Sequence, residues 1–183
     1  MSVSLGVIGL GRIAQSLLTP LIDRGDFLPH QILGVVGSES SVGKALKNFP
    51  KGLRVVSSDN PNADEVWSSP IKLLAVKPQQ LSEIKEKKEE NQQLSEKPLM
   101  ISLLAGVTLS RLQNLFPGHI CVRAVPNTPV LVKAGLTGLA WGDGITSEHR
   151  LIVKKIFTPI SEVFELPEKQ LDAFLALTSS GPA

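Results

Sequence analysis

Aromatic residues and cysteine are scarce in this sequence. It holds no tyrosine, aromatic residues make up 4% of the chain, and Cys121 is the only cysteine. A single cysteine excludes an internal disulfide framework and favours a reducing, cytoplasmic compartment. Because Cys121 lies in the apolar run HICVRAV, a buried, unreactive thiol is a better interpretation than a catalytic nucleophile.

A strong excess of one charge is also missing. The 19 Lys and Arg residues nearly balance the 17 Asp and Glu residues, and the net charge of +2 is spread along the chain. Without a basic stripe or aromatic residues to stack on bases, we expect no nucleic-acid partner. Every apolar run is shorter than the roughly 20 residues that cross a bilayer, so we expect no membrane span. The 42% of hydrophobic residues can nevertheless bury a sizeable core.

Metal-ligand spacings and catalytic triads are not evident either. His30, His119 and His149 are scattered along the chain, and neither a metal site nor a Ser/His/Asp set can be assembled from them by spacing. We therefore predict no metal, and exposed or hydrogen-bonded structural roles for the three histidines.

What the sequence does contain is an alternation of short apolar runs with helical patterns. The stretches 13–24 and 147–157 repeat apolar residues with a period near 3.6, whereas the continuous apolar run 99–105 is typical of a strand covered on both faces. This rhythm predicts an α/β fold, Rossmann-like and doubly wound, with a mostly parallel sheet and helices on both faces. The expected strands lie in the runs 4–10, 31–37, 53–58, 71–76, 99–105, 119–125, 136–142 and 161–166.

The stretch 81–94, LSEIKEKKEENQQL, is the most highly charged part of the chain. Its acidic and basic residues recur at i,i+4 spacing, which is typical of a solvated helix surface. We predict a surface helix here and assign it no function.

The strongest local motif is VIGLGRIA at 7–14, which follows the first strand run and opens a helical pattern. It has the form G-x-G-x-x-A, in which Gly9 permits a tight turn, Gly11 lets the backbone approach a pyrophosphate, and Ala14 allows close packing of helix on sheet. The start of the helix then presents unpaired N–H groups to the phosphates. This strand, turn and helix context predicts a dinucleotide site.

The end of the second strand run bears on which dinucleotide is bound. Ser38, Ser40 and Ser41 could donate hydrogen bonds to the extra phosphate of NADP, and Lys44 could supply positive charge. Glu39 would repel that phosphate if its side chain pointed inward. An ordinary polar turn explains the serines nearly as well, so NADP and NAD both stay open from these residues alone.

Three further segments end predicted strands, where open α/β sheets bind ligands: AVKPQ, SLLAGVT and RAVPNTPV. Together with VIGLGRIA and the terminal SSGPA, in this order, these strings resemble the cofactor-binding half of the pyrroline-5-carboxylate reductase family. The resemblance covers essentially the whole chain. RAVPNTP followed by SGPA is its most diagnostic part, because AVKP and AGVT recur in relatives with other substrates.

The resemblance implies reduction of 1-pyrroline-5-carboxylate, a small imino acid, to L-proline by NAD(P)H in proline biosynthesis, with NADPH favoured over NADH. The cofactor-binding residues that it implies are Gly9, Leu10, Gly11, Arg12, Ile13, Ala14, Ser38, Asn60, Ala75, Val76, Lys77, Pro78, Ala105, Gly106 and Pro126. The catalytic or substrate-side residues that it implies are Asn127, Thr128, Ser180 and Glu168.

The same resemblance divides the chain into a dinucleotide-binding domain at 1–165 and a connecting segment at 166–183. In the family, SSGPA begins the long helix of an all-helical second domain, which forms the subunit interface and most substrate contacts. We therefore expect a cytoplasmic homo-oligomer assembled through that domain, and no reductase activity from these 183 residues alone.

Two departures from the family pattern bear on this interpretation. TSSGPA at 178–183 stands where relatives read SGSGPA, and Glu39 stands where many relatives carry a basic or neutral residue. The alternative functions are a related imine or β-hydroxyacid dehydrogenase half-domain, and a nucleotide-binding regulatory module without catalysis.

Overall fold

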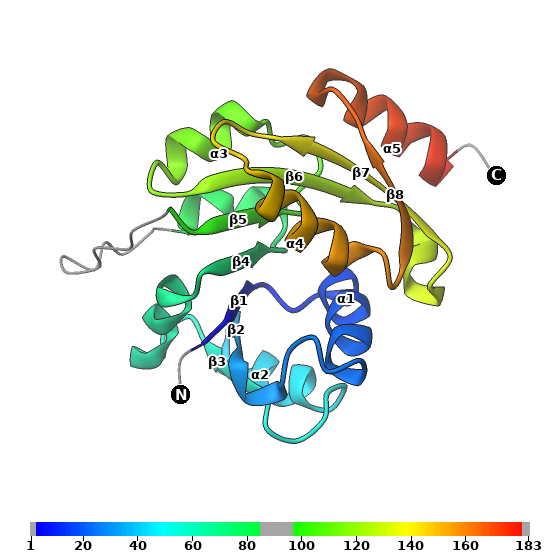
Figure 1. The fold of residues 1–183 in the computed structure, drawn as a ribbon. Helices are drawn as coiled ribbons and strands as arrows, with labels where there is room; N and C mark the ends of the chain where they lie inside the picture. The colour runs from blue at the N-terminus through cyan, green and yellow to red at the C-terminus, as the bar shows by residue number, and fades with distance from the viewer. Residues whose placement is uncertain (1–2, 85–96, 181–183) are drawn as a thin grey trace.

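The computed structural model describes residues 3–84 and 97–180. Their strands are β1 (Leu5–Ile8), β2 (Ile32–Val36), β3 (Arg54–Ser57), β4 (Ile71–Leu74), β5 (Leu99–Ser102), β6 (Ile120–Pro126), β7 (Gly135–Trp141) and β8 (Ser161–Glu165). They form one eight-stranded sheet in the order β3-β2-β1-β4-β5-β6-β7-β8 (Figure 1). Neighbouring strands are parallel except β6 and β7, which are antiparallel. The predicted doubly wound, mostly parallel sheet is confirmed.

Helices cover both faces of this sheet. The α-helices are α1 (Arg12–Asp23), α2 (Glu39–Leu46), α3 (Leu109–Leu115), α4 (Ser147–Phe157) and α5 (Leu171–Ser180). Short 3-10 segments are η1 (Pro29–Gln31), η2 (Pro61–Ser68), η3 (Pro78–Glu83), η4 (Thr128–Val132) and η5 (Glu168–Gln170). The predicted helix at 147–157 coincides with α4, and α1 begins and ends one residue before the predicted stretch 13–24. Of the charged stretch 81–94, residues 81–83 belong to η3, and the part from 85 on lies outside the described residues.

Strand β5 shows why the strands are continuous apolar runs in the sequence. Every residue of β5 is buried. Ile101 packs in a core cluster with residues of α1 and α4, whereas the adjacent Met100 packs in a second cluster with residues of α3 and α5. Successive side chains of a strand point to opposite faces, so a strand between two helical layers needs apolar residues at every position.

The order of the strands places a crevice at one edge of the sheet. The chain passes from β1 to β2 and β3 on one side, and then crosses to β4, β5 and β6 on the other. Because these six strands are parallel, their carboxyl ends meet at the same edge, and the loops that follow β1 and β4 diverge there (Figure 1). Doubly wound sheets bind their ligands at such a reversal of strand order.

Candidate dinucleotide-binding site

The turn between β1 and α1 depends on Gly9. This residue has a positive φ of 92°, and a Cβ atom added to it would lie 2.7 Å from the backbone carbonyl of Ala75, in the loop after β4. Any side chain at this position would strain the backbone and collide with that loop. The tight turn predicted from the sequence is therefore required by two independent features of the structure.

Gly11 has a different role. Its φ of −74° is open to any residue, yet a Cβ atom added here would have no described atom within 4 Å. Gly11 therefore leaves open space beside the backbone, as the close approach of a pyrophosphate would need. Ala14, one turn later, is fully buried between α1 and the sheet.

The first turn of α1 has the properties of an anion site. Gly11 is its N-cap, and no described side chain caps the helix. The backbone N–H groups of a first helical turn have no partner within the helix, and the helix dipole adds partial positive charge there. Phosphate groups are well matched to such an end.

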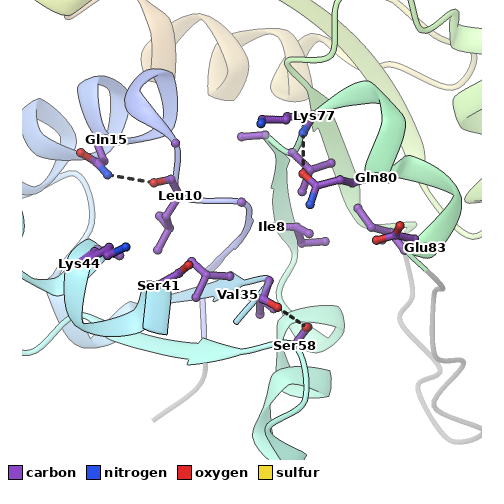
Figure 2. Close-up of a pocket in the computed structure, with 18 of the residues that line it drawn as sticks. Ile8, Leu10, Gln15, Val35, Ser41, Lys44, Ser58, Lys77, Gln80 and Glu83 are labelled. Atoms are coloured by element: carbon purple, nitrogen blue, oxygen red, sulfur yellow. Dashed lines mark hydrogen bonds between the residues drawn. The ribbon is translucent and has the colours of Figure 1, made fainter. Parts of the chain in front are cut away.

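A cavity of about 490 Å³ opens at this edge of the sheet, in front of the glycine turn (Figure 2). The loops after the first four parallel strands all contribute to its lining, and they bring together Gly9, Leu10 and Gly11 with Gly37, Ser58, Ala75, Val76 and Lys77. The glycine motif and the AVKP motif, 64 or more residues apart in the chain, thus share one cavity.

Polar groups line this cavity on two opposite sides. Figure 2 shows Ser41 and Lys44 of α2 on one side, and Lys77, Gln80 and Glu83 on the other. These residues contribute two cations, a hydroxyl, an amide and a carboxylate to a lining that also contains apolar residues, glycines and the polar side chains of Gln15, Asn48 and Ser58. This combination suits a large polar ligand with anionic groups, such as a dinucleotide.

The serines after β2 form hydrogen bonds with one another, and one of them also lines the cavity. The Ser38 hydroxyl lies 3.1 Å from the Ser40 hydroxyl and 2.9 Å from that of Ser41, and Ser41 is the one that lines the cavity. Glu39 is exposed in the first turn of α2 and lies outside the cavity lining. Its carboxylate stabilises the start of α2 through the helix dipole.

Asn60 also has a local role. Its Oδ1 accepts a hydrogen bond of 2.9 Å from the backbone N–H of Asn62 and so caps η2. The side chain that the loop after β3 contributes to the cavity is that of Ser58, two residues earlier. Sequence reasoning missed Ser58 because serines are frequent in polar loops and nothing marks this one.

A smaller cavity of about 240 Å³ lies farther along the sheet, at the ends of β5 and β6. Its lining includes Ala105 and Pro126, which the resemblance assigns to the cofactor, and Thr128, which it assigns to the substrate side. Leu175 and Ser179 of α5 complete it. The loops after β1 to β4 thus line the larger cavity, and the loops after β5 and β6 line the smaller one at the same edge of the sheet.

Asn127 is buried, with 4% of its surface exposed. Its Nδ2 donates to the backbone oxygen of Thr178, 3.1 Å away, and its Oδ1 accepts from the N–H of Leu136 at 2.8 Å. Both ends of the amide are therefore engaged by backbone groups. The resemblance implies a catalytic or substrate-side role for Asn127, and in the structure its amide joins β6, β7 and α5.

Glu168 has a comparable structural position. Its Oε1 accepts from the Arg123 guanidinium at 2.9 Å and from the N–H of Leu109 at 2.6 Å. Asp172 lies 3.1 Å from the other terminal nitrogen of Arg123, which is only 2% exposed. The two carboxylates therefore anchor η5 and α5 to β6. A signal for this anchor is present in the sequence, because an arginine within the apolar run HICVRAV requires partners for its charge.

The predicted site residues fall into three groups. The larger cavity is lined by Gly9, Leu10, Gly11, Ala75, Val76 and Lys77, and the smaller one by Ile13, Ala105, Pro126 and Thr128. Outside both linings lie Arg12, Ala14, Ser38, Asn60, Pro78, Gly106, Asn127 and Glu168, and Ser180 is the last residue of α5. Gln15, Lys44, Asn48 and Gln80 belong to the larger lining although the motifs do not include them.

The histidines lie away from both cavities. His30 is exposed, and Nδ1 of His149 lies 3.0 Å from the Thr146 hydroxyl in the cap of α4. His119 is buried beside Trp67 and Phe116, where burial and, to a smaller extent, the charge of Lys72 lower its pKa to about 3. Among residues 3–84 and 97–180, no group of three or more His, Cys, Asp and Glu side chains could hold a metal ion. No helix within the same ranges is long and apolar enough to cross a membrane.

Comparison with known proteins agrees with this geometry. A family model described as NADP oxidoreductase, coenzyme F420-dependent, matches residues 4–106. The pyrroline-5-carboxylate reductase of Synechocystis sp. is 38% identical over 183 residues, which are 100% of this chain and 66% of that protein. A solved pyrroline-5-carboxylate reductase from Coxiella burnetii has a TM-score of 0.81 at 28% identity, over 100% of this chain and 66% of the other.

A Plasmodium falciparum pyrroline carboxylate reductase solved with NADP bound shares the fold, with a TM-score of 0.75 at 24% identity over 98% of this chain and 63% of the other. The chain thus spans 66% or less of the length of these three proteins. The family model covers more than half of the chain. The chain therefore belongs to the family described as NADP oxidoreductase, coenzyme F420-dependent, and the pyrroline-5-carboxylate reductases named above are similar to it over 98 to 100% of its length.

Proposed function

We propose that this chain is the dinucleotide-binding part of an enzyme that reduces 1-pyrroline-5-carboxylate to L-proline with NADPH. The observation that carries the proposal is the pair of neighbouring cavities at the carboxyl edge of the sheet. One begins at an uncapped helix start and a glycine turn, and the other is lined by Pro126 and Thr128 of the loop PNTP, which is part of the resemblance to the reductases. The similar proteins are named for this same reaction.

NADPH is the cofactor that the larger cavity favours. Lys44 and Ser41 line it on the α2 side, where the loop after β2 approaches the adenosine ribose in folds of this kind. An ammonium and a hydroxyl there would bind a 2′-phosphate by charge and hydrogen bonding. Glu39, the residue that would oppose such binding, lies outside the lining. The description of the family also names NADP.

The residues of this chain would act by binding and orientation. The backbone at 9–11 and the first turn of α1 would hold the pyrophosphate, and Ala105, Pro126 and Thr128 would bound the space for the nicotinamide and the imine. When bound, NADPH supplies the hydride. The apolar lining by Leu131, Val125 and Leu175 would limit the access of water to the smaller cavity.

We also propose the division into a domain at 1–165 and a segment at 166–183 that leads to a second, helical domain. Residues 168–180 pack on the sheet through the Arg123 and Asn127 contacts, so this segment would hold the second domain in a fixed place. Assembly of subunits through that domain and a cytoplasmic location belong to the same proposal, the latter supported by the single cysteine.

The test is a chimera in which the segment that follows the matched region in the Synechocystis reductase is joined after Ala183. We expect this chimera to oxidise NADPH when 1-pyrroline-5-carboxylate is added, and the unextended chain to bind NADPH without turnover. The Gly11→Val chimera is the matched control and should be inactive. A chimera that folds and binds NADPH but leaves 1-pyrroline-5-carboxylate unchanged would refute the proposed substrate.

A further inference from the structure

We propose that Gln15 is a positioning residue that holds the Leu10–Gly11 peptide in the orientation needed by a pyrophosphate. The inference rests on the proposed dinucleotide function and concerns how the glycine turn is prepared before the ligand arrives. Gln15 is not part of the G-x-G-x-x-A motif, and its role follows from contacts that the fold creates.

The side chain of Gln15 folds back onto the turn from which its helix starts. Its Nε2 donates to the backbone oxygen of Leu10 at 2.9 Å (Figure 2), and its own backbone N–H donates to the oxygen of Gly11 at 3.0 Å. Two successive carbonyl groups of the glycine turn are therefore tied to one residue of α1. Both Gln15 and Leu10 line the larger cavity.

The bond to Leu10 fixes more than one oxygen atom. The described peptide bonds are trans, and in a trans peptide the C=O and the following N–H point in opposite directions. Holding the Leu10 oxygen toward Gln15 therefore turns the Gly11 N–H the opposite way. The same hydrogen bond occupies the Leu10 carbonyl oxygen, whose partial negative charge would repel a phosphate if the oxygen faced the ligand.

A hydrogen bond matters here because the Leu10–Gly11 peptide is followed by a glycine, which restricts backbone rotation less than any other residue. Gly11 lacks a Cβ atom and has open space around it, so steric effects do little to prevent rotation of the peptide that precedes it. The Leu10 side chain is held on the other side, because it lies directly on Gly34 of β2 and leaves no room there for a Cβ atom. With the Leu10 side chain packed, the orientation of the Leu10–Gly11 peptide is what remains to be fixed, and the hydrogen bond from Gln15 fixes it.

Asn48 orients the amide of Gln15. Its Nδ2 donates to Gln15 Oε1 at 3.2 Å and has a longer contact of 3.5 Å with the backbone oxygen of Lys44. A glutamine amide can present either its oxygen or its nitrogen to a neighbour, and a donor on Oε1 leaves Nε2 for the Leu10 carbonyl. Asn48 also lines the larger cavity. Two side-chain hydrogen bonds, from Asn48 to Gln15 and from Gln15 to the Leu10 oxygen, therefore link the end of α2 to the glycine turn.

The experiment compares Gln15→Met, which keeps the length of the side chain but removes the amide, with Gln170→Met, an exposed glutamine outside both cavities. Calorimetry should give an NADPH dissociation constant about tenfold higher for Gln15→Met, as expected from the loss of one hydrogen bond that organises the site. Gln170→Met should bind as the unchanged chain does. Adenosine 2′-monophosphate, which has no pyrophosphate, should bind equally well to all three proteins.

A second measurement tests the orientation of the Leu10–Gly11 peptide in the absence of a ligand. In ¹⁵N-labelled protein, the amide resonance of Gly11 should move in Gln15→Met, and should move less in Asn48→Ala, which loses the orienting bond but leaves α1 unchanged. Unaltered NADPH affinity together with an unaltered Gly11 resonance in Gln15→Met would overturn the inference. Equal weakening of NADPH and adenosine 2′-monophosphate would also overturn it, because Gln15 would then contact the adenosine end directly.

The proposed function can fail separately. If the unchanged chain bound neither NADPH nor NADH, dinucleotide binding would be refuted, and with it the purpose assigned to Gln15. The Gly11 resonance in the ligand-free variants would still decide whether Gln15 holds the peptide. If Gln15→Met did not fold, Asn48→Ala would supply both measurements.

Discussion

Asn127, at the end of β6, donates its side-chain amide to the backbone oxygen of Thr178, near the end of α5, across 3.1 Å. The bond fixes α5 relative to the loop after β6, and these two elements form facing parts of the smaller cavity through Thr128, Leu175 and Ser179. Arg123 holds the other end of α5 through Asp172. The helix that would lead into a second domain is thus attached to the sheet at both ends.

We predict that Asn127→Ala lowers the free energy of unfolding by about 1 to 3 kcal/mol. The Leu136 N–H and the Thr178 oxygen would each lose a partner in a partly buried setting. Urea unfolding measures this change. Thr128→Ala, an exposed neighbour that lines the cavity, is the control and should change stability little. Equal stability of the two variants would show that the bridge contributes nothing to the fold.

The two glycines of the turn should respond differently to substitution. Gly9→Ala should destabilise the fold by about 2 kcal/mol or more, because its Cβ would meet the Ala75 backbone at a positive φ. Gly11→Val should keep a nearly unchanged melting temperature but lose NADPH binding, because the new side chain would occupy the open space beside the turn. Thermal melting and calorimetry on both variants test this. Unchanged NADPH affinity in Gly11→Val would contradict the assigned site.

Lys44 should determine the preference between the two cofactors. Lys44→Met is expected to weaken NADPH by about 5- to 30-fold and NADH hardly at all, since roughly 1 to 2 kcal/mol of charge-assisted binding to the extra phosphate would be lost. Glu39→Gln is a useful comparison because Glu39 lies outside the lining, and it should leave the ratio of the two dissociation constants unchanged. A larger effect of Glu39→Gln than of Lys44→Met would reverse the assignment of the phosphate site.

Acid should destabilise the protein through His119. Its pKa is about 3 in the folded chain and near 6.5 when unfolded, so the unfolded state binds the extra proton between these values. Stability from this group is fully present above pH 6.5 and falls as the pH drops toward 3, by up to about 1.4 kcal/mol per pH unit. His119→Phe removes the titrating group and retains an aromatic ring beside Trp67 and Phe116. The loss of stability between pH 7 and pH 4 should therefore be smaller in this variant, and an equal loss in both proteins would exclude His119 as the cause.

The sequence by itself determined the features that depend on neighbouring residues. Continuous apolar runs predict strands buried on both faces, and Leu99–Ser102 is such a strand. Apolar spacing near 3.6 predicts the helix Ser147–Phe157 to the residue. The glycine turn is also local, because Gly9 and Ala14 lie within one strand, turn and helix unit. Each of these properties arises from covalent geometry or from periodicity over a few residues.

Only the tertiary structure decided how side chains far apart in the sequence pair with one another. Asn127 is bonded to a residue 51 positions away, Glu168 to Arg123 across 45, and Gln15 to Asn48 across 33. A motif shows that an amide or a carboxylate is present, but not whether it faces a cavity or a backbone group. That choice depends on which elements pack together, because a buried polar side chain is held by the partners that the fold brings within hydrogen-bonding distance.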